Sequence, residues 1–89
     1  MEDGAGSAEP RELILTLSCP DRRGIVAGVA GLIAERGGNI IDSHQFGDPD
    51  QGVFFMRIHF AAPPETVVAD WHAGVQPLAD ELAMTWELH

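Results

Sequence analysis

The sequence is poor in positive charge: it contains no lysine, and its five basic side chains are all arginines. The 14 aspartate and glutamate side chains outnumber them, so the formal net charge at pH 7 is −9. Nucleic acid is bound through a basic surface that neutralises phosphates, and an anionic membrane surface repels an acidic chain. The composition therefore argues against nucleic acid and membranes as partners.

The sequence also lacks a second cysteine, a long apolar run and a secretion signal. Cys19 alone cannot form an internal disulfide, which is typical of a protein in the reducing cytoplasm. The apolar runs are only a few residues long, whereas about 20 apolar residues are needed to span a bilayer. The first residues, MEDG, are acidic and small and do not resemble a basic and apolar leader. We therefore expect a cytoplasmic protein without a membrane segment.

The length of 89 residues suits a single small domain. A domain of this size buries only about 60–65% of the surface of its unfolded chain, so its stability is marginal. Homodimerisation, or docking onto a larger partner, would bury additional surface. The small size also argues against a deep catalytic pocket, and we expect no catalytic residues, no metal site and no cofactor.

Hydrophobic periodicity divides the chain into a tail and six elements. Residues 1–10 have almost nothing to bury and are expected to form a disordered tail before a folded domain at 11–89. The pattern predicts strands at 11–20, 39–46, 53–60 and 84–88, helices at 25–36 and 63–82, and a hairpin loop at 47–52.

Several single residues refine the two expected helices. Asp21 is expected to cap the first helix, and Gly28 and Gly31 are expected to bring that helix close to the sheet. Pro77 lies inside the second helix, where it lacks an N–H group. We therefore expect a kink or break in the second helix near Gly74.

The element order β-α-β-β-α-β, with right-handed crossovers, predicts an α+β fold of the ferredoxin-like type. In this βαββαβ sandwich, a four-stranded antiparallel sheet carries both helices on one face. Many unrelated functions use this fold, so the function has to be inferred from particular residues. An RNA-recognition module has the same element order, but it needs basic residues that this acidic chain lacks.

Four segments carry a family signal: LSCPDRRGIVA at 17–27, GGNIIDSHQF at 37–46, GVFFMR at 52–57 and MTWEL at 84–88. The first segment, and GGNI at 37–40 in the second, resemble ACT domains, which are small-molecule-sensing regulatory modules. All four together are similar to the N-terminal ACT domains of the formyltetrahydrofolate deformylase family. The resemblance covers residues 12–89.

The resemblance implies a function that this chain would share with a second domain. In that family the chain continues into a formyltransferase-like domain, which uses an Asn-His-Asp constellation to hydrolyse 10-formyltetrahydrofolate to formate and tetrahydrofolate. The formate supplies purine biosynthesis. The chain would then be a non-catalytic, homodimerising domain that senses glycine or methionine and acts on the deformylase catalytic domain. The alternative is a free-standing ACT adaptor or co-regulator that binds an amino acid or a protein partner.

The resemblance also implies ligand contacts at Cys19, Asp21, Gly24 and Asn39. A free helix N-terminus can receive a ligand carboxylate, and a nearby amide or carboxylate can receive its ammonium group. The same residues have plain structural interpretations, with Asp21 as a helix cap, Asn39 as a turn residue and Cys19 as a small buried hydrophobe. The negative charge of Asp21 would also repel a ligand carboxylate.

The third expected strand predicts an exposed interface. If Phe54 and every second residue after it face the helices, then Phe55 and Arg57 lie on the opposite face, which no helix covers. Ile14, Thr16 and Val53 share that face. Exposed apolar patches of this kind mark interfaces, so Phe55 and Arg57 are candidate dimer contacts.

Overall fold

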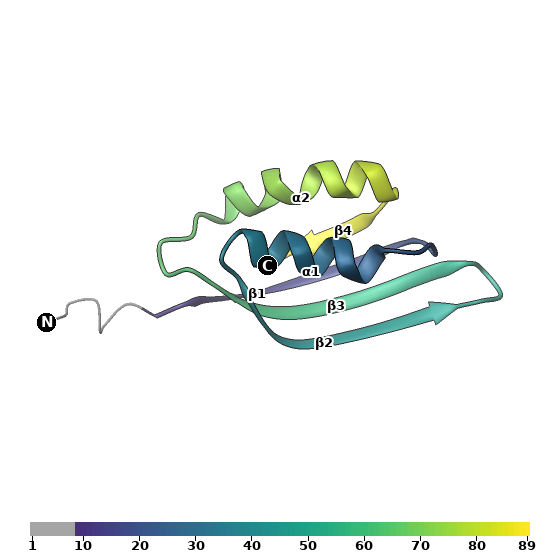
Figure 1. The fold of residues 1–89 in the computed structure, drawn as a ribbon, viewed down its shortest axis with the longest axis horizontal. Helices are drawn as coiled ribbons and strands as arrows, with labels where there is room; N and C mark the ends of the chain where they lie inside the picture. The colour runs from purple at the N-terminus through teal and green to yellow at the C-terminus, as the bar shows by residue number, and fades with distance from the viewer. Residues whose placement is uncertain (1–8) are drawn as a thin grey trace, which may run out of the picture.

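The computed structural model describes residues 9–89, which form four strands and two helices (Figure 1). Most of the tail expected at 1–10 lies outside the described residues; Glu9 and Pro10 are exposed. The elements are β1 (Arg11–Pro20), α1 (Ile25–Glu35), β2 (Asn39–Asp48), β3 (Val53–Ala62), α2 (Val68–Leu82) and β4 (Thr85–Leu88). The expected order β-α-β-β-α-β is confirmed.

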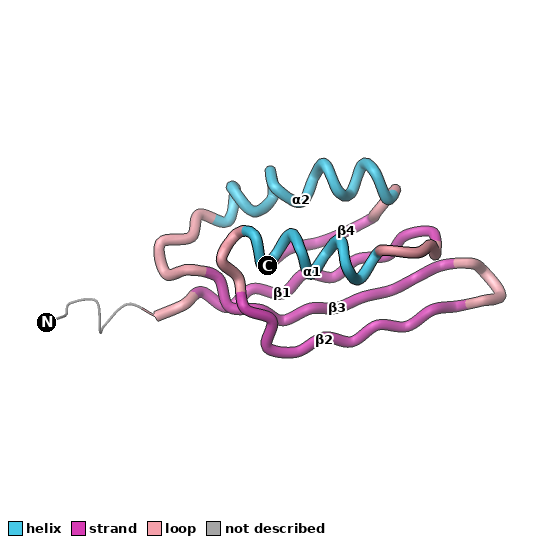
Figure 2. Tube along the Cα trace, in the orientation of Figure 1, coloured by secondary structure: helices cyan, strands magenta, loops and turns pink. Residues whose placement is uncertain are grey.

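The strands form one antiparallel sheet in the order β2-β3-β1-β4. Both helices lie on the same side of this sheet (Figures 1 and 2), so the predicted ferredoxin-like sandwich is confirmed. Within residues 9–89 no helix covers the other side, which we call the open face. The register places on it Glu12, Ile14, Thr16 and Ser18 of β1, Asp42, His44, Phe46 and Asp48 of β2, Val53, Phe55, Arg57 and His59 of β3, and Thr85 and Glu87 of β4.

The hydrophobic core lies between the sheet and the two helices. Its members come from alternate positions of β1 and β3 and from one stripe of each helix: Leu13, Leu15, Leu17, Cys19, Met56, Ile58, Phe60, Ile25, Val29, Ile33, Trp71 and Leu82. The rings of Phe60 and Trp71 lie 5.0 Å apart, which joins β3 to α2. The inward faces that alternation predicts for β1 and β3 are therefore confirmed.

Helix α1 begins directly after Gly24, which has a left-handed conformation with φ 93° and ψ 0°. Among the described residues no side chain caps this helix, so the expected cap at Asp21 is wrong. The backbone N–H of Asp21 instead donates to the carbonyl of Gly52 at 2.8 Å. This bond ties Asp21 to the β2–β3 hairpin, and the left-handed turn at Gly24 sets the start of the helix.

Helix α1 ends at paired glycines in a Schellman motif. Gly37, with φ 81°, donates its N–H to the carbonyl of Ala34 at 3.0 Å, and Gly38 donates to the carbonyl of Ile33 at 2.9 Å. These two bonds satisfy carbonyl groups that a helix end would otherwise leave unpaired. The two glycines therefore end α1.

Gly28 and Gly31, the two glycines inside α1, are expected to bring the helix close to the sheet, and this expectation is wrong. A Cβ atom at Gly28 would lie 3.4 Å from Cδ1 of Leu78 in α2, whereas no described atom lies within 4 Å of such an atom at Gly31. Gly28 therefore serves the packing between the two helices, and Gly31 faces solvent.

Helix α2 begins at Val68, so the start expected at Pro63 is wrong. The N–H of Thr66 donates to the carbonyl of Pro63 at 3.0 Å, so the proline opens a separate turn before the helix. The helix then continues through Pro77 to Leu82, so of the expected kink or break the break is wrong. Its buried stripe lies on both sides of Pro77, and this shared packing holds the two halves in one helix despite the missing N–H group.

Ala83, which follows α2, has a left-handed backbone with φ 56°. A side chain at such a position costs about 1–2 kcal/mol relative to glycine. We expect Ala83→Gly to raise the free energy of unfolding by about 1 kcal/mol, because glycine adopts this conformation without steric strain. Chemical denaturation of the two proteins measures the difference, and an unchanged or lowered midpoint would contradict the expectation.

Strand β2 forms one edge of the sheet and extends two residues beyond its predicted end, so that the connecting loop is only residues 49–52. Ile41 has no partner on β3, since the register shifts between Ile40 and Asp42. This β-bulge sets which side chains of β2 reach the open face. No residue of β2 is buried, and Phe46 is 65% exposed.

Candidate functional site

Three of the four candidate ligand residues lie close together at the end of β1 and the start of α1, but they differ in exposure. Cys19 is buried in the core at 4% exposure. Burial, and next the negative charge of Asp21, raise the pKa of its thiol. Asp21 and Gly24 are exposed. The turn therefore presents to solvent a carboxylate and a glycine backbone, while the thiol faces the helices.

The burial of Cys19 leads to a direct chemical expectation. The native thiol should react slowly with an aromatic disulfide reagent near neutral pH, because it is enclosed and its raised pKa disfavours the thiolate. Unfolding in guanidinium chloride should make the reaction fast. A Cys19→Ala/Ser43→Cys variant, with its thiol on exposed β2, is the matched control. Rapid labelling of native Cys19 would contradict the expectation.

Gly24 is the candidate residue whose backbone conformation is most restrictive. We expect Gly24→Val to lower the free energy of unfolding by about 1–2 kcal/mol, because φ of 93° is unfavourable for a branched side chain. No described atom lies within 4 Å of a Cβ atom there, so the loss comes from the backbone. Thermal denaturation measures it. Gly24→Asn, which tolerates this region better, should lose less, and equal losses would contradict this explanation.

Asn39 lies at the opposite end of the sheet from the turn. It pairs with Ala61 of β3, whereas Pro20, which precedes Asp21, pairs with Val53. The eight residue steps from Val53 to Ala61 span about 26 Å of strand. The structure therefore does not bring Asn39 together with Asp21 and Gly24 within one copy of the chain.

Phe55 lies on the open face, as the sequence predicted. Ile14, Thr16, Val53 and Arg57 lie on the same side of the sheet. The ring of Phe55 stacks at 6.4 Å on that of Phe46, the residue opposite it on β2. Next to these rings is a shallow hollow of about 340 Å³, lined by Thr16, Leu17, His44, Gln45, Phe46, Phe55, Met56 and Arg57. Phe55 is 45% exposed, so this part of the open face is an apolar surface beside a cationic side chain.

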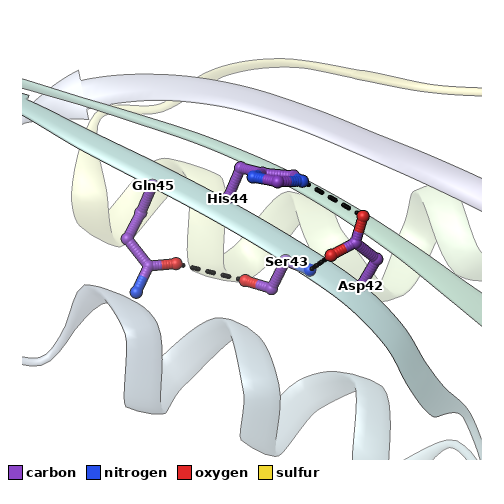
Figure 3. A network of polar contacts seen from close by, with 4 residues as sticks. All are labelled: Asp42, Ser43, His44 and Gln45. Carbon is purple, nitrogen blue, oxygen red and sulfur yellow. Dashed lines mark hydrogen bonds and ion pairs between the residues drawn. The ribbon is translucent and has the colours of Figure 1, made fainter.

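Two pairs of histidine and carboxylate lie on the open face. His44 donates to Asp42 at 3.1 Å on β2 (Figure 3), and His59 of β3 donates to Glu12 of β1 at 2.7 Å. The hydrogen bond and charge of His44 hold the pKa of the Asp42 carboxyl below its usual range. The hydroxyl of Ser43, which belongs to the helix side of β2, donates to Gln45 at 3.1 Å. Two of the four histidines are therefore part of a polar network on the sheet.

Phe46 and the histidine–carboxylate pairs were not predicted from the sequence as members of this face. The predicted hairpin contained the signal, since pairing the two strands from Asp48 and Val53 outward places Phe46 opposite Phe55. The bulge at Ile41 has no comparable signal in the sequence. If the bulge is left out of the pairing, Asn39 and Ile40 are assigned to the wrong faces of the sheet.

The described part of the chain was compared with the requirements of a metal cluster and of a membrane-spanning helix. Within residues 9–89, no group of three or more His, Cys, Asp or Glu side chains is placed to hold a metal ion. Over the same residues, neither helix is long and apolar enough to cross a membrane.

Comparison with protein families identifies the domain. Residues 13–73, which run from β1 into α2, match the ACT domain. The chain belongs to the ACT domain family. The resemblance inferred from the sequence segments is therefore confirmed.

Curated relatives of this ACT domain are much longer proteins. The formyltetrahydrofolate deformylase of Bacillus subtilis is 41% identical over 76 residues, a match that covers 83% of this chain and 25% of the relative. The formyltetrahydrofolate deformylase of Synechocystis is 35% identical over 80 residues and is matched over 27% of its length. The chain thus spans about a quarter of the curated relatives that it matches.

Solved structures give the same relationship. A formyltetrahydrofolate deformylase from Pseudomonas putida superposes with a TM-score of 0.83 at 31% identity, over 88% of this chain and 28% of that protein. An ACT domain protein from Streptococcus pneumoniae superposes with a TM-score of 0.77 at 27% identity, over 88% of this chain and 86% of that protein. The ACT fold is therefore found both within long deformylases and in a protein of about this size.

Proposed function

We propose that this chain is the regulatory ACT domain of a formyltetrahydrofolate deformylase. The 41% identity to the Bacillus subtilis deformylase, over a quarter of that protein, carries the proposal. The complete protein would act in the cytoplasm and hydrolyse 10-formyltetrahydrofolate to formate and tetrahydrofolate for purine biosynthesis. The ACT domain would provide dimerisation and the sensing of glycine or methionine.

The placement of the candidate residues supports an effector site shared between two copies. Asp21 and Gly24 are separated from Asn39 by about 26 Å along the sheet, which is longer than any free amino acid. One small ligand that contacts both groups must therefore lie between two copies of the domain. Effector binding and dimerisation are coupled in this proposal, because each stabilises the other.

The 89-residue chain itself is proposed to be non-catalytic. Hydrolysis of a formyl amide requires a positioned base and oxyanion stabilisation in a cleft. The hollows within residues 9–89 are shallow, and we expect no release of formate from 10-formyltetrahydrofolate above background. Release of formate by the pure chain would contradict this part of the proposal.

The decisive experiment measures effector binding together with assembly. We expect glycine or methionine to shift the amide resonances of Gly24 and Asn39 and to tighten dimerisation in sedimentation equilibrium. Asn39→Ala should abolish the effect of the effector, whereas Ser43→Ala, on the same strand, should preserve it. If neither glycine nor methionine alters the resonances or the assembly, the sensing function is contradicted. A reading frame that continues past His89 into an Asn-His-Asp domain would support the deformylase assignment.

A free-standing ACT adaptor or co-regulator is the second candidate function. The Streptococcus pneumoniae ACT domain protein, 86% of which is matched by this chain, favours it. An ACT domain of this length can evidently exist outside a deformylase. The same reading frame distinguishes the two candidates, since an adaptor requires no formyltransferase-like domain after His89.

A further inference from the structure

The hollow beside Phe46 and Phe55 has an aromatic side and a cationic side. The register sets Phe46 opposite Phe55 in one row across the sheet and His44 opposite Arg57 in the next row. Neighbouring rows on one face are about 7 Å apart, and both rows line the hollow of about 340 Å³ together with Thr16 of β1. This volume lies at the lower end of the range for small-molecule sites.

The guanidinium group of Arg57 is available to an anion from solvent. In the described part of the chain, no ion pair joins Arg57 to a carboxylate. Asp42, on the neighbouring strand, already accepts hydrogen bonds from His44 at 3.1 Å and from the backbone N–H of Ser43 at 2.9 Å (Figure 3). Glu87 lies in the same row as Arg57 but two strands away, which is about 10 Å. A guanidinium group in this position can hold a carboxylate through two parallel hydrogen bonds.

This surface does not suit a second copy of the chain. The proposed effector site requires the turn at Asp21 of one copy to lie beside Asn39 of the other. When two open faces are stacked, only a two-fold axis across the strands at the level of Arg57 meets this requirement, because this level is midway between the two ends of the site. That axis sets Arg57 against the partner's Arg57, and like charges opposite each other are unfavourable. The open face is therefore free for another occupant, and Phe55 and Arg57 take a role other than the dimer contacts expected from the sequence.

We propose that the hollow binds a small aromatic acid, with one planar ring and one carboxylate joined to it directly or through a short chain. The ring packs against the stacked rings of Phe46 and Phe55. The carboxylate accepts two parallel hydrogen bonds from Arg57, and the hydroxyl of Thr16 is a further donor. This hollow lies on the open face, whereas the effector site proposed above lies at the ends of the sheet, so the two sites are distinct.

The charge of the molecule selects this class of ligand. Glu12, Asp42, Asp48 and Glu87 share the open face with a single arginine, in a chain of net charge −9. A nucleotide carries a phosphate with two negative charges, which this field would repel and which needs several cations. An aliphatic acid would not stack on the two phenylalanine rings, and a neutral ring would leave the arginine without a partner. One ring and one negative charge therefore match the hollow.

Titration of the 89-residue chain with phenylacetate tests this site. At fixed ionic strength we expect the backbone amide resonances of Phe46, Phe55 and Arg57 to shift, with a dissociation constant of about 5 mM, which is typical of a ligand of about ten heavy atoms. Three matched compounds separate the contribution of the ring from that of the charge. Cyclohexylacetate lacks the planar ring, phenylacetamide lacks the negative charge and phenyl phosphate carries a second one. Each should bind at least about fivefold more weakly than phenylacetate.

Substitutions on the open face assign the contacts. Arg57→Gln should weaken the binding of phenylacetate about fivefold or more and leave that of phenylacetamide unchanged, because only the charged ligand uses the guanidinium group. Phe55→Ala should weaken the binding of both compounds. Arg23→Gln removes the same charge from an exposed position in the turn before α1, and it should have little effect. Arg57 and Phe55 are both exposed, so the variants should unfold thermally as the parent does or nearly so.

The outcomes separate this site from the proposed effector site. Shifts confined to the hollow, with the expected loss in Arg57→Gln, support the aromatic-acid site. The absence of a saturable shift up to about 50 mM phenylacetate, or equal binding of cyclohexylacetate, overturns it and leaves the sensing of glycine or methionine untouched. Shifts at Gly24 and Asn39 without shifts at Phe55 also overturn it, because they would place the acid in the effector site. A response to glycine or methionine is measured at Gly24 and Asn39, so the failure of one proposal is distinguishable from the failure of the other.

Discussion

Replacing Phe60 with alanine is expected to lower the free energy of unfolding by about 3–5 kcal/mol. Phe60 is 1% exposed, lies toward the end of β3 and packs its ring 5.0 Å from that of Trp71. Its removal leaves a cavity between the sheet and α2 that the neighbouring strands cannot close. Since a small domain has only about 5–15 kcal/mol of stability in total, the variant should unfold near or below physiological temperature. Guanidinium denaturation followed by circular dichroism measures the loss.

Phe55→Ala is the matched control for this prediction. It removes the same side chain from the same strand, but from the open face, where Phe55 is 45% exposed. In dilute protein, where dimers dissociate, the loss should be about 1 kcal/mol or less. Equal losses for the two variants would contradict the assignment of the two faces of β3.

The strands of this domain were predictable from sequence because burial on one face of a sheet has a period of two. The alternating leucines of β1 and the alternating large residues of β3 encode their inward faces directly. These two central strands also fix the element order, since each connection along the chain has a length suited to a hairpin or a helical crossover. The ACT resemblance could also be recognised from the sequence, because its segments fall on the tight turns around α1 and on the start of β3.

The ends of the helices were less predictable, because they depend on backbone conformation and on contacts distant in the sequence. Asp21 has the right chemistry for a helix cap, but the left-handed turn at Gly24 places the helix start beyond its reach. Pro63 is suited to a first helical position, yet it opens a separate turn closed by Thr66. Local propensity identified both helices but could not choose between neighbouring turns.

The candidate site was predictable as a set of residues and not as an arrangement. The spacing in sequence does not reveal that Asn39 and Asp21 lie at opposite ends of the sheet, because α1 carries the chain back along its length. Nor does it reveal that Phe46 joins Phe55, which depends on the pairing of two strands across a hairpin. Both facts follow from the register. They turn a list of candidate contacts into a proposed site between two copies.

Gly38→Ala is expected to lower the free energy of unfolding by about 2–3 kcal/mol, although it adds a single methyl group. A Cβ atom at Gly38 would lie 2.6 Å from Cγ2 of Ile33, 3.0 Å from the carbonyl oxygen of Ile33 and 3.2 Å from Cη2 of Trp71. None of these atoms can move easily, because Ile33 and Trp71 are buried and that carbonyl accepts the hydrogen bond that ends α1. Gly31→Ala adds the same methyl group where no described atom lies within 4 Å, and should instead stabilise α1 by up to about 1 kcal/mol. The two substitutions should therefore shift the melting temperature in opposite directions, as measured by thermal denaturation. A Gly38→Ala protein as stable as the parent would show that the α1–β2 junction is not tightly packed.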